Sequence, residues 1–177
     1  MINRLSRVLV TALCLAAVSS VRAADKFEVA GVTFTKPDKW VQTTPSSSMR
    51  AAQLEIREGS AKANVVFFYF GPGGAGGVAA NVDRWLGQFK EPKDQLKSKV
   101  EEQTVNGTKV SHVRAEGTYM ASTGGFFGPK TAQPDSMLYG VIVEGKQGPI
   151  FIKATGPRKI IEGALTDARK MVEDALK

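Results

Sequence analysis

The dipeptide Asn106-Gly107 limits the fold of this chain more than any other feature of the sequence. Residues 100–105 and 108–120 flank it, and both segments have the composition of β-strands. A two-residue hairpin turn needs positive φ at both central positions, which Asn and Gly adopt more readily than other residues. The segment therefore predicts an antiparallel hairpin. Asn106-Gly107-Thr108 also spells an N-glycosylation sequon, but the turn accounts for the same residues without a modification.

Further strands are predicted on both sides of this hairpin. The run 65–70, VVFFYF, is apolar on both faces and is typical of a central strand that is covered at least partly on each side. The other segments are short and are separated by turns that contain Gly, Pro or Ser. The predicted strands are 27–35 as a bent hairpin around Gly31, then 40–41, 49–57, 63–70, 137–144 and 150–155.

Two segments have helical periodicity. Residues 78–89 repeat apolar side chains at helical spacing, and Pro92 closes the segment. The last helix is expected to begin at Pro157, with Thr155 as its cap. Its apolar face comprises Ile160, Ile161, Ala164, Leu165, Ala168, Met171, Val172 and Ala175. A mixed rather than basic polar face favours docking on the sheet over a membrane-surface role.

The order of these elements is strands, helix, strands, helix. Hairpin turns dominate, so the sequence predicts an α+β fold in which two helices pack on a mainly antiparallel sheet. The charge run at 90–99 is expected to be a solvated connection. The Gly- and Pro-rich residues 121–136 are expected to form a long loop.

The first 23 residues predict a secretory signal peptide, which leaves residues 24–177 as a single domain. Two arginines precede an apolar run at 8–18, and Val21-Arg22-Ala23 supplies small residues at positions −3 and −1 of a cleavage site. The run is too short to span a bilayer, and no later segment is as hydrophobic. We therefore expect an exported protein, periplasmic or extracellular, without a stable membrane span in its mature chain.

Residue usage excludes several chemistries. The one cysteine, Cys14, lies inside the predicted signal, so the mature domain has no disulfide, thiol nucleophile or thiolate metal site. With His112 as the sole histidine, a zinc site has too few ligands, and calcium-loop motifs are absent. We expect no metal and no cofactor.

The charge of the mature domain is modest. Three of the 24 Lys and Arg residues belong to the predicted signal, which leaves 21 against 17 Asp and Glu, a net charge of +4. Both signs are interspersed, as on an ordinary soluble surface. The basic residues neither cluster nor alternate with aromatic residues, so a nucleic-acid partner is not expected.

Residues 71–76, GPGGAG, match the glycine pattern of a dinucleotide-binding loop and follow a hydrophobic strand. Pro72 removes a backbone donor, and the chain continues into hairpins rather than a second parallel strand. No Lys-Ser or Lys-Thr pair follows, which also excludes a phosphate loop. A helix start with exposed amides can still hold a small anion.

The sequence contains no motif that indicates nucleophilic catalysis. The mature chain lacks a G-x-S-x-G elbow, and His112 lies in a predicted strand, where a lone histidine is usually half-exposed. Glu101 and Glu102 are adjacent in a strand and therefore point to opposite faces, so they cannot act as a carboxylate pair.

Two clusters form the candidate binding surface. Gly73, Gly76, Asn81 and Arg84 lie in the glycine loop and the helix after it; here Trp85 and Phe89 are expected in the core, and Arg84 is either solvated or a ligand group. The second cluster, Phe126, Phe127 and Lys130, lies in the long 121–136 loop. Its two phenylalanines either fold back on the domain or form an exposed contact patch.

Stretches along nearly the whole mature chain resemble a family of uncharacterised exported bacterial proteins. They are PDKW at 37–40, SMRAA at 48–52, FGPG at 70–73 with Gly76-Gly77, NVDRW at 81–85 with Gln88-Phe89, GTY at 117–119, MLYG at 137–140 and KATGP at 153–157. The order of elements is similar to the Mog1/PsbP-like α/β/α sandwich. Characterised members of that superfamily are binding and assembly factors, which implies a binding role, but their binding residues match no motif here.

We therefore expect an exported, non-catalytic domain that binds an envelope protein or a small ligand through the glycine-loop edge and the 121–136 loop. The alternative is an envelope hydrolase or other enzyme that uses a carboxylate or His112 in a cleft. A polar cleft that gathers His112 with an acid and a serine would favour the enzyme. An apolar patch around Phe126 and Phe127 would favour the binding domain.

Overall fold

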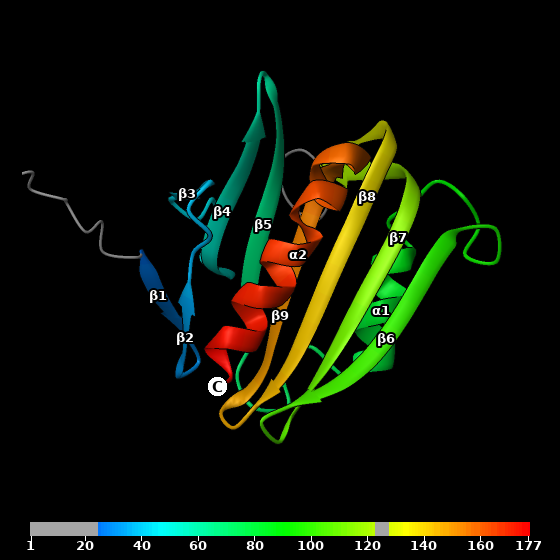
Figure 1. Ribbon diagram of the computed structural model, residues 1–177. Coiled ribbons are helices and arrows are strands. Elements are labelled where there is room, and N and C mark those ends of the chain that lie inside the picture. The colour runs from blue at the N-terminus through cyan, green and yellow to red at the C-terminus, as the bar shows by residue number, and fades with distance from the viewer. Residues whose placement is uncertain (1–24, 123–127) are drawn as a thin grey trace, which may run out of the picture.

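A seven-stranded antiparallel sheet forms the middle layer of the fold, with one helix on each face (Figure 1). The computed structural model describes residues 25–122 and 128–177. The predicted signal peptide at 1–23, together with Phe126 and Phe127, lies outside the described residues. The described arrangement confirms the predicted α+β class.

The strands follow the order β3-β4-β5-β9-β8-β7-β6, and a two-stranded ribbon, β1-β2, forms a second small sheet. The strands are β1 (Lys26–Val29), β2 (Val32–Thr35), β3 (Trp40–Thr43), β4 (Arg50–Glu58), β5 (Ala61–Tyr69), β6 (Lys97–Val105), β7 (Thr108–Ser122), β8 (Lys130–Gly145) and β9 (Gly148–Pro157). The helices are α1 (Val78–Leu86) and α2 (Arg158–Ala175).

The first face of the sheet is covered by α2 and the β1-β2 ribbon. The predicted apolar side of α2 is buried, with Leu165 and Ala175 partly so. Phe27 and Phe34 of the ribbon pack against Phe67 of β5, with ring centroids 5.0 and 5.1 Å from the Phe67 ring. Burial of this apolar surface is the main stabilising term of the domain.

The second face is covered only in part, because α1 is short and lies against β7 and β8. Trp85 and Phe89 are buried there as predicted, among apolar side chains of β7, β8 and β9. Beyond this cluster, the second face carries polar side chains from β4, β5 and β9. That half of the sheet positions the candidate site.

The predicted hairpin at Asn106-Gly107 is present. Both residues have positive φ, 48° and 80°, and Val105 pairs with Thr108 across the turn. The two strands are longer than predicted, because Lys97 at the start of β6 pairs with Glu116 of β7 in register and through a 3.0 Å ion pair. The expectation of a solvated connection up to residue 99 is therefore wrong at its end: an edge strand tolerates exposed lysines.

The predicted loop at 121–136 is largely a hairpin. Strand β7 continues to Ser122 and β8 begins at Lys130, and these two residues pair with each other. A register shift between Gly117 and Tyr119 accommodates Pro134, which could not donate a ladder hydrogen bond in a regular strand. The bulge therefore allows a Gly- and Pro-rich sequence to extend the sheet.

Both helices start or end differently from the sequence-based expectation. Helix α1 stops at Leu86 rather than at 89, because Gly87 follows and the next backbone pairs with β7 instead. Thr155 does not cap α2, because it lies inside β9 and pairs with Leu138. The helix begins at Arg158 with Pro157 as its N-cap residue.

Candidate functional site

The uncovered half of the second face forms a groove of about 820 Å³, called here the polar groove. Two cross-strand rows make its floor: Gln53, Val66 and Lys153 in one, and Glu55, Asn64 and Thr155 in the other. The far ends of β7 and β8 supply one wall, which includes Ser122 and Gln133. The described part of the predicted 121–136 contact region thus borders the groove.

Lys153 projects from β9 into this groove. Its Nζ donates hydrogen bonds to Gln88 Oε1 at 3.1 Å and to the Tyr119 hydroxyl at 3.3 Å. Both partners are neutral. Burial lowers the pKa of Lys153 to about 8, and the charges of Arg50 and Arg84 act in the same direction.

The partners of Lys153 are held in place by backbone hydrogen bonds between β7 and the segment after α1. Met120 N donates to Gln88 O at 2.8 Å, and Lys90 N donates to Thr118 O at 2.9 Å. These bonds attach the segment after α1 to the strand, and the Tyr119 hydroxyl donates to Gln88 Oε1 at 3.1 Å. Burial raises the pKa of Tyr119 to about 12, so its hydroxyl stays protonated at neutral pH.

The carboxylate that lines the groove is already neutralised. Glu55 accepts from Arg57 at 2.8 Å and from Lys62 at 3.3 Å, and these hydrogen bonds lower its pKa. Arg50, at the other end of β4, instead donates to the neutral Gln53 Oε1 at 2.8 Å. Among the described residues, neither Arg50 nor Lys153 forms an ion pair.

Lys153, Arg50 and Tyr119 each lie in a stretch that carried the sequence resemblance, but that resemblance assigned them no role. The available signal is the position of Lys153 between Phe151 and Thr155, in a strand whose neighbours are mostly apolar. A lysine in the middle of a central strand is rare, because burying an unpaired ammonium is costly. The signal becomes clear once β9 is known to lie between β5 and β8.

Of the glycine-loop candidates, Gly73, Gly76 and Asn81 do not line the polar groove, and Arg84 acts on it only through its charge. Gly73 and Gly76 have positive φ, 70° and 77°, and Gly76 borders a separate cavity of about 290 Å³. The buried Asn81 donates to the carbonyls of Ala75, Gly76 and Gly77 at 2.9–3.2 Å. Arg84 donates to Ala75 O at 3.0 Å and to Asn81 Oδ1 at 2.7 Å.

These hydrogen bonds give Asn81 and Arg84 a local structural role, because they fix the glycine loop to the first turns of α1.

Lys130 is exposed at the start of β8, where it pairs with Ser122 at the rim of the polar groove. The structure thus brings Lys130 near the groove and places Gly73, Gly76 and Asn81 elsewhere. Whether any of these residues binds a partner stays a prediction.

His112 is 2% exposed, rather than half-exposed as its strand position suggested. Its Nδ1 lies 2.7 Å from the Tyr139 hydroxyl, and its Nε2 lies 2.9 Å from Gln103 Nε2. The amide nitrogen of Gln103 can only donate, so His112 Nε2 accepts and Nδ1 carries the proton. Burial lowers the pKa of His112 to about 4, and the charge of Arg169 adds to this effect.

His112 lines a cavity of about 280 Å³ on the α2 side, together with Glu101 and Arg169. The carboxylate of Glu101 forms ion pairs with Arg169 and Lys99. Among the described residues that line this cavity there is no serine. The constellation of histidine, acid and serine that would favour a hydrolase is therefore not assembled here.

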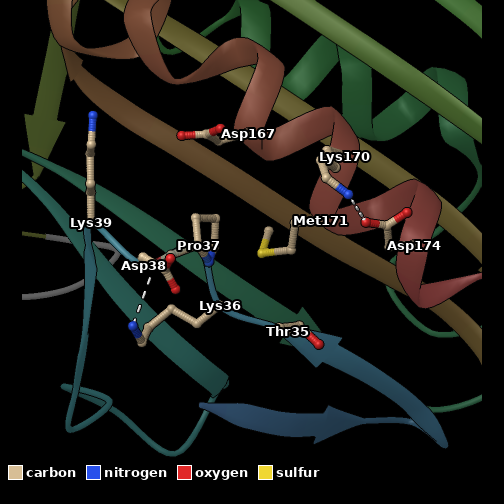
Figure 2. Close-up of a pocket in the computed structure, with 9 residues that line it drawn as sticks. All are labelled: Thr35, Lys36, Pro37, Asp38, Lys39, Asp167, Lys170, Met171 and Asp174. Carbon is tan, nitrogen blue, oxygen red and sulfur yellow. Dashed lines mark hydrogen bonds and ion pairs between the residues drawn. The ribbon is translucent and has the colours of Figure 1, made fainter. Parts of the chain in front are cut away.

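A cavity of about 390 Å³ separates α2 from the segment that joins β2 to β3 (Figure 2). Lys36 and Lys170 line it, but each already has an ionic partner: Asp25 at 3.2 Å for Lys36, and Asp174 for Lys170. The cavity thus carries charges of both signs, some paired as above and some, on Asp38, Lys39 and Asp167, without an ion pair among the described residues.

Two further properties bear on the expected partners and cofactors. Within the described part of the chain, no three His, Cys, Asp or Glu side chains gather where they could hold a metal ion. No helix among residues 25–122 and 128–177 is long and apolar enough to cross a bilayer.

Comparison with known proteins gives a fold. No family model and no curated protein matches the chain. The solution structure of cyanobacterial PsbP (CyanoP) from Synechocystis sp. PCC 6803 has a TM-score of 0.51 and 9% identity, covering 89% of this chain and 95% of that one. The fold is PsbP-like. A Pseudomonas aeruginosa protein of unknown function has a TM-score of 0.45 and 13% identity over 84% of this chain and 93% of that one.

The PsbP-like fold agrees with the resemblance stated from the sequence. An identity of 9% transfers no residue role, because function depends on sites rather than on folds. The resemblance to uncharacterised exported proteins stays a prediction.

Proposed function

We propose that this protein is an exported, non-catalytic binding domain that acts at the cell envelope, with its ligand in the polar groove. The observation that carries the proposal is the groove, whose volume of about 820 Å³ is within the usual range for small-molecule sites. Its polar side chains are held by hydrogen bonds on neighbouring strands, which gives a preformed site. The rim at Ser122 and Gln133 belongs to the hairpin end that the sequence singled out for contact.

The groove favours binding over hydrolysis. Two of its serine hydroxyls donate to backbone carbonyls, Ser122 to Gly128 O and Ser136 to Pro134 O. Glu55 is held by two cations and keeps a lowered pKa, which makes it a weak general base. The enzyme alternative based on His112 would require that buried ring to leave two hydrogen bonds.

Export is tested on the full chain, expressed in a bacterium with two membranes. The mass of the protein in the periplasmic fraction should correspond to a chain that begins at Ala24. A Leu9→Arg variant, which interrupts the apolar run, should stay in the cytoplasm at full mass. Full-length protein confined to the cytoplasm in both cases would contradict the export part of the proposal.

Ligand binding is tested by identifying small molecules that are released on denaturing protein purified from its own envelope fraction. Asn64→Trp places a large side chain on the groove floor, whereas Lys109→Trp places the same side chain on an exposed strand position. A compound released by the wild type and Lys109→Trp but absent from a folded Asn64→Trp variant would support the groove. Equal release from all three would contradict it.

A further inference from the structure

The charge of the polar groove is unbalanced. Its lining includes the cations Arg50, Lys62 and Lys153 and the carboxylate Glu55. Glu55 is shared by Lys62 and by Arg57. Two cationic groups, on Arg50 and Lys153, are thus left with neutral partners among the described residues.

Of these two cations, Lys153 is expected to destabilise the fold more. Its ammonium has three donors, and the structure uses two of them, on an amide oxygen and a hydroxyl. A half-buried ammonium without a counterion is unfavourable, and an anion that joins it relieves this cost. The side of Lys153 that faces the groove is where such an anion has access.

The other residues that line the groove indicate what kind of molecule carries the anionic group. Val66 and Phe68 place apolar surface on the same floor, next to the two cations. The groove is also far larger than an inorganic ion, whose volume is comparable to the ~30 Å³ share of one water molecule. Asn64, Thr155 and Ser136 add neutral polar groups farther along the groove.

We infer that the polar groove binds a small organic acid, with its carboxylate between the Lys153 ammonium and the Arg50 guanidinium and its carbon skeleton along Val66 and Phe68. This inference rests on the proposed function and narrows it to one ligand class. A planar carboxylate suits both cations, because it can accept a forked pair of hydrogen bonds from Arg50 and one from Lys153.

The test compares benzoate with benzamide, which has nearly the same shape and no charge. Backbone amide resonances of the purified protein are followed by NMR during titration to tens of millimolar. Benzoate should shift groove resonances such as those of Asn64 and Lys153 in a saturable way, and benzamide should bind at least about tenfold more weakly, the ratio expected from one charge-assisted hydrogen bond. Benzoate should also raise the pKa of Lys153 above its value in the free protein.

Variants assign the effect to the named cations. Lys153→Met and Arg50→Met should each weaken benzoate binding by about tenfold or more. Lys109→Met removes an exposed cation outside the groove and should leave the affinity unchanged. The spectra themselves show whether each variant is folded, and Lys153→Arg, which keeps the charge, should retain part of the affinity.

The inference is wrong if benzamide binds as well as benzoate, if folded Lys153→Met binds benzoate normally, or if neither benzoate nor citrate moves groove resonances. A saturable response to inorganic phosphate without one to either acid would overturn the organic-acid assignment. Each of these results refutes the organic-acid assignment alone if the wild type releases a compound that the Asn64→Trp variant does not. If the two proteins release the same compounds, the proposed function is refuted as well.

Discussion

The indole ring of Trp85 lies directly over Gly140, so that a Cβ at position 140 would come within 2.2 Å of Trp85 Cζ3. Trp85 comes from the short α1, and Gly140 lies in β8. The missing side chain lets the helix approach the sheet closely and bury the ring. This contact fixes α1 over β8 and thereby leaves the other half of the face open for the polar groove.

Gly140→Ala should destabilise the protein by about 2–3 kcal/mol, because the added methyl group must displace the buried indole. Chemical denaturation monitored by tryptophan fluorescence measures this loss. Gly163→Ala is the matched control at an exposed position of α2, where the new Cβ meets only Glu58 Oε1 at 3.9 Å. That change should stabilise the protein by about 0.5–1 kcal/mol. A neutral effect of Gly140→Ala would disprove the close packing.

Asn81→Asp should cost about 2 kcal/mol of stability. The side-chain amide donates to three carbonyls of the glycine loop, and an aspartate has no donor and would repel them. Arg84→Ala removes exposed bonds to the same loop and should cost less than about 1 kcal/mol. Thermal unfolding measures both changes. If the two variants lose equal stability, Asn81 is not the main anchor of the loop.

The strand pattern and the cores of the two helices could be predicted from the sequence because they depend on local periodicity. Turn chemistry located the hairpin at Asn106-Gly107, and helical spacing identified Trp85 as a core residue. The ends of the elements were predicted less well. Thr155 resembles a helix cap in the sequence, but pairing with β8 keeps it in a strand.

The polar groove could not be predicted, because it depends on which half of the sheet α1 leaves open. Lys153 and Arg50 are 103 positions apart in the numbering and meet only through the β4-β5-β9 order of the sheet. Gln88 reaches Lys153 because backbone hydrogen bonds to β7 hold the segment after α1 against the sheet. None of these relations has a signal within one segment of the sequence.

His112 should make the protein sensitive to acid. Burial lowers its pKa to about 4 in the folded state, against an ordinary 6.5, and the facing charges are Arg169, Glu101 and Glu173. The unfolded state therefore binds more protons between pH 6.5 and 4, and stability falls as the pH falls through that window. The loss attributable to His112 should approach about 3 kcal/mol.

The measurement is urea denaturation of the wild type and His112→Gln between pH 7 and 4. The stability of the variant should depend less steeply on pH, because glutamine cannot take up the proton. Carboxylates such as Glu101 titrate in both proteins, so the difference between the two curves isolates the histidine. Parallel curves would show that His112 does not control the acid response.

Lys153→Met should stabilise the free protein below about pH 8. The substitution removes a half-buried ammonium, and the Tyr119 hydroxyl still donates to Gln88 Oε1, so no buried polar group is orphaned. The pKa of Lys153 is about 8 in the folded state against an ordinary 10.5. Below pH 8 both states are protonated and the wild type bears the full cost of the charge, up to about 3 kcal/mol.

Between pH 8 and 10.5 the unfolded wild type binds more protons than the folded one, so its stability rises with pH and the advantage of Lys153→Met should shrink. Denaturation of both proteins at pH 7 and pH 10 measures this change. A lysine that served only to hold Gln88 and Tyr119 would give a less stable variant at both pH values. Stabilisation at pH 7 combined with lost benzoate binding would instead mark Lys153 as a residue kept for its ligand, because functional groups are often retained at a cost in stability.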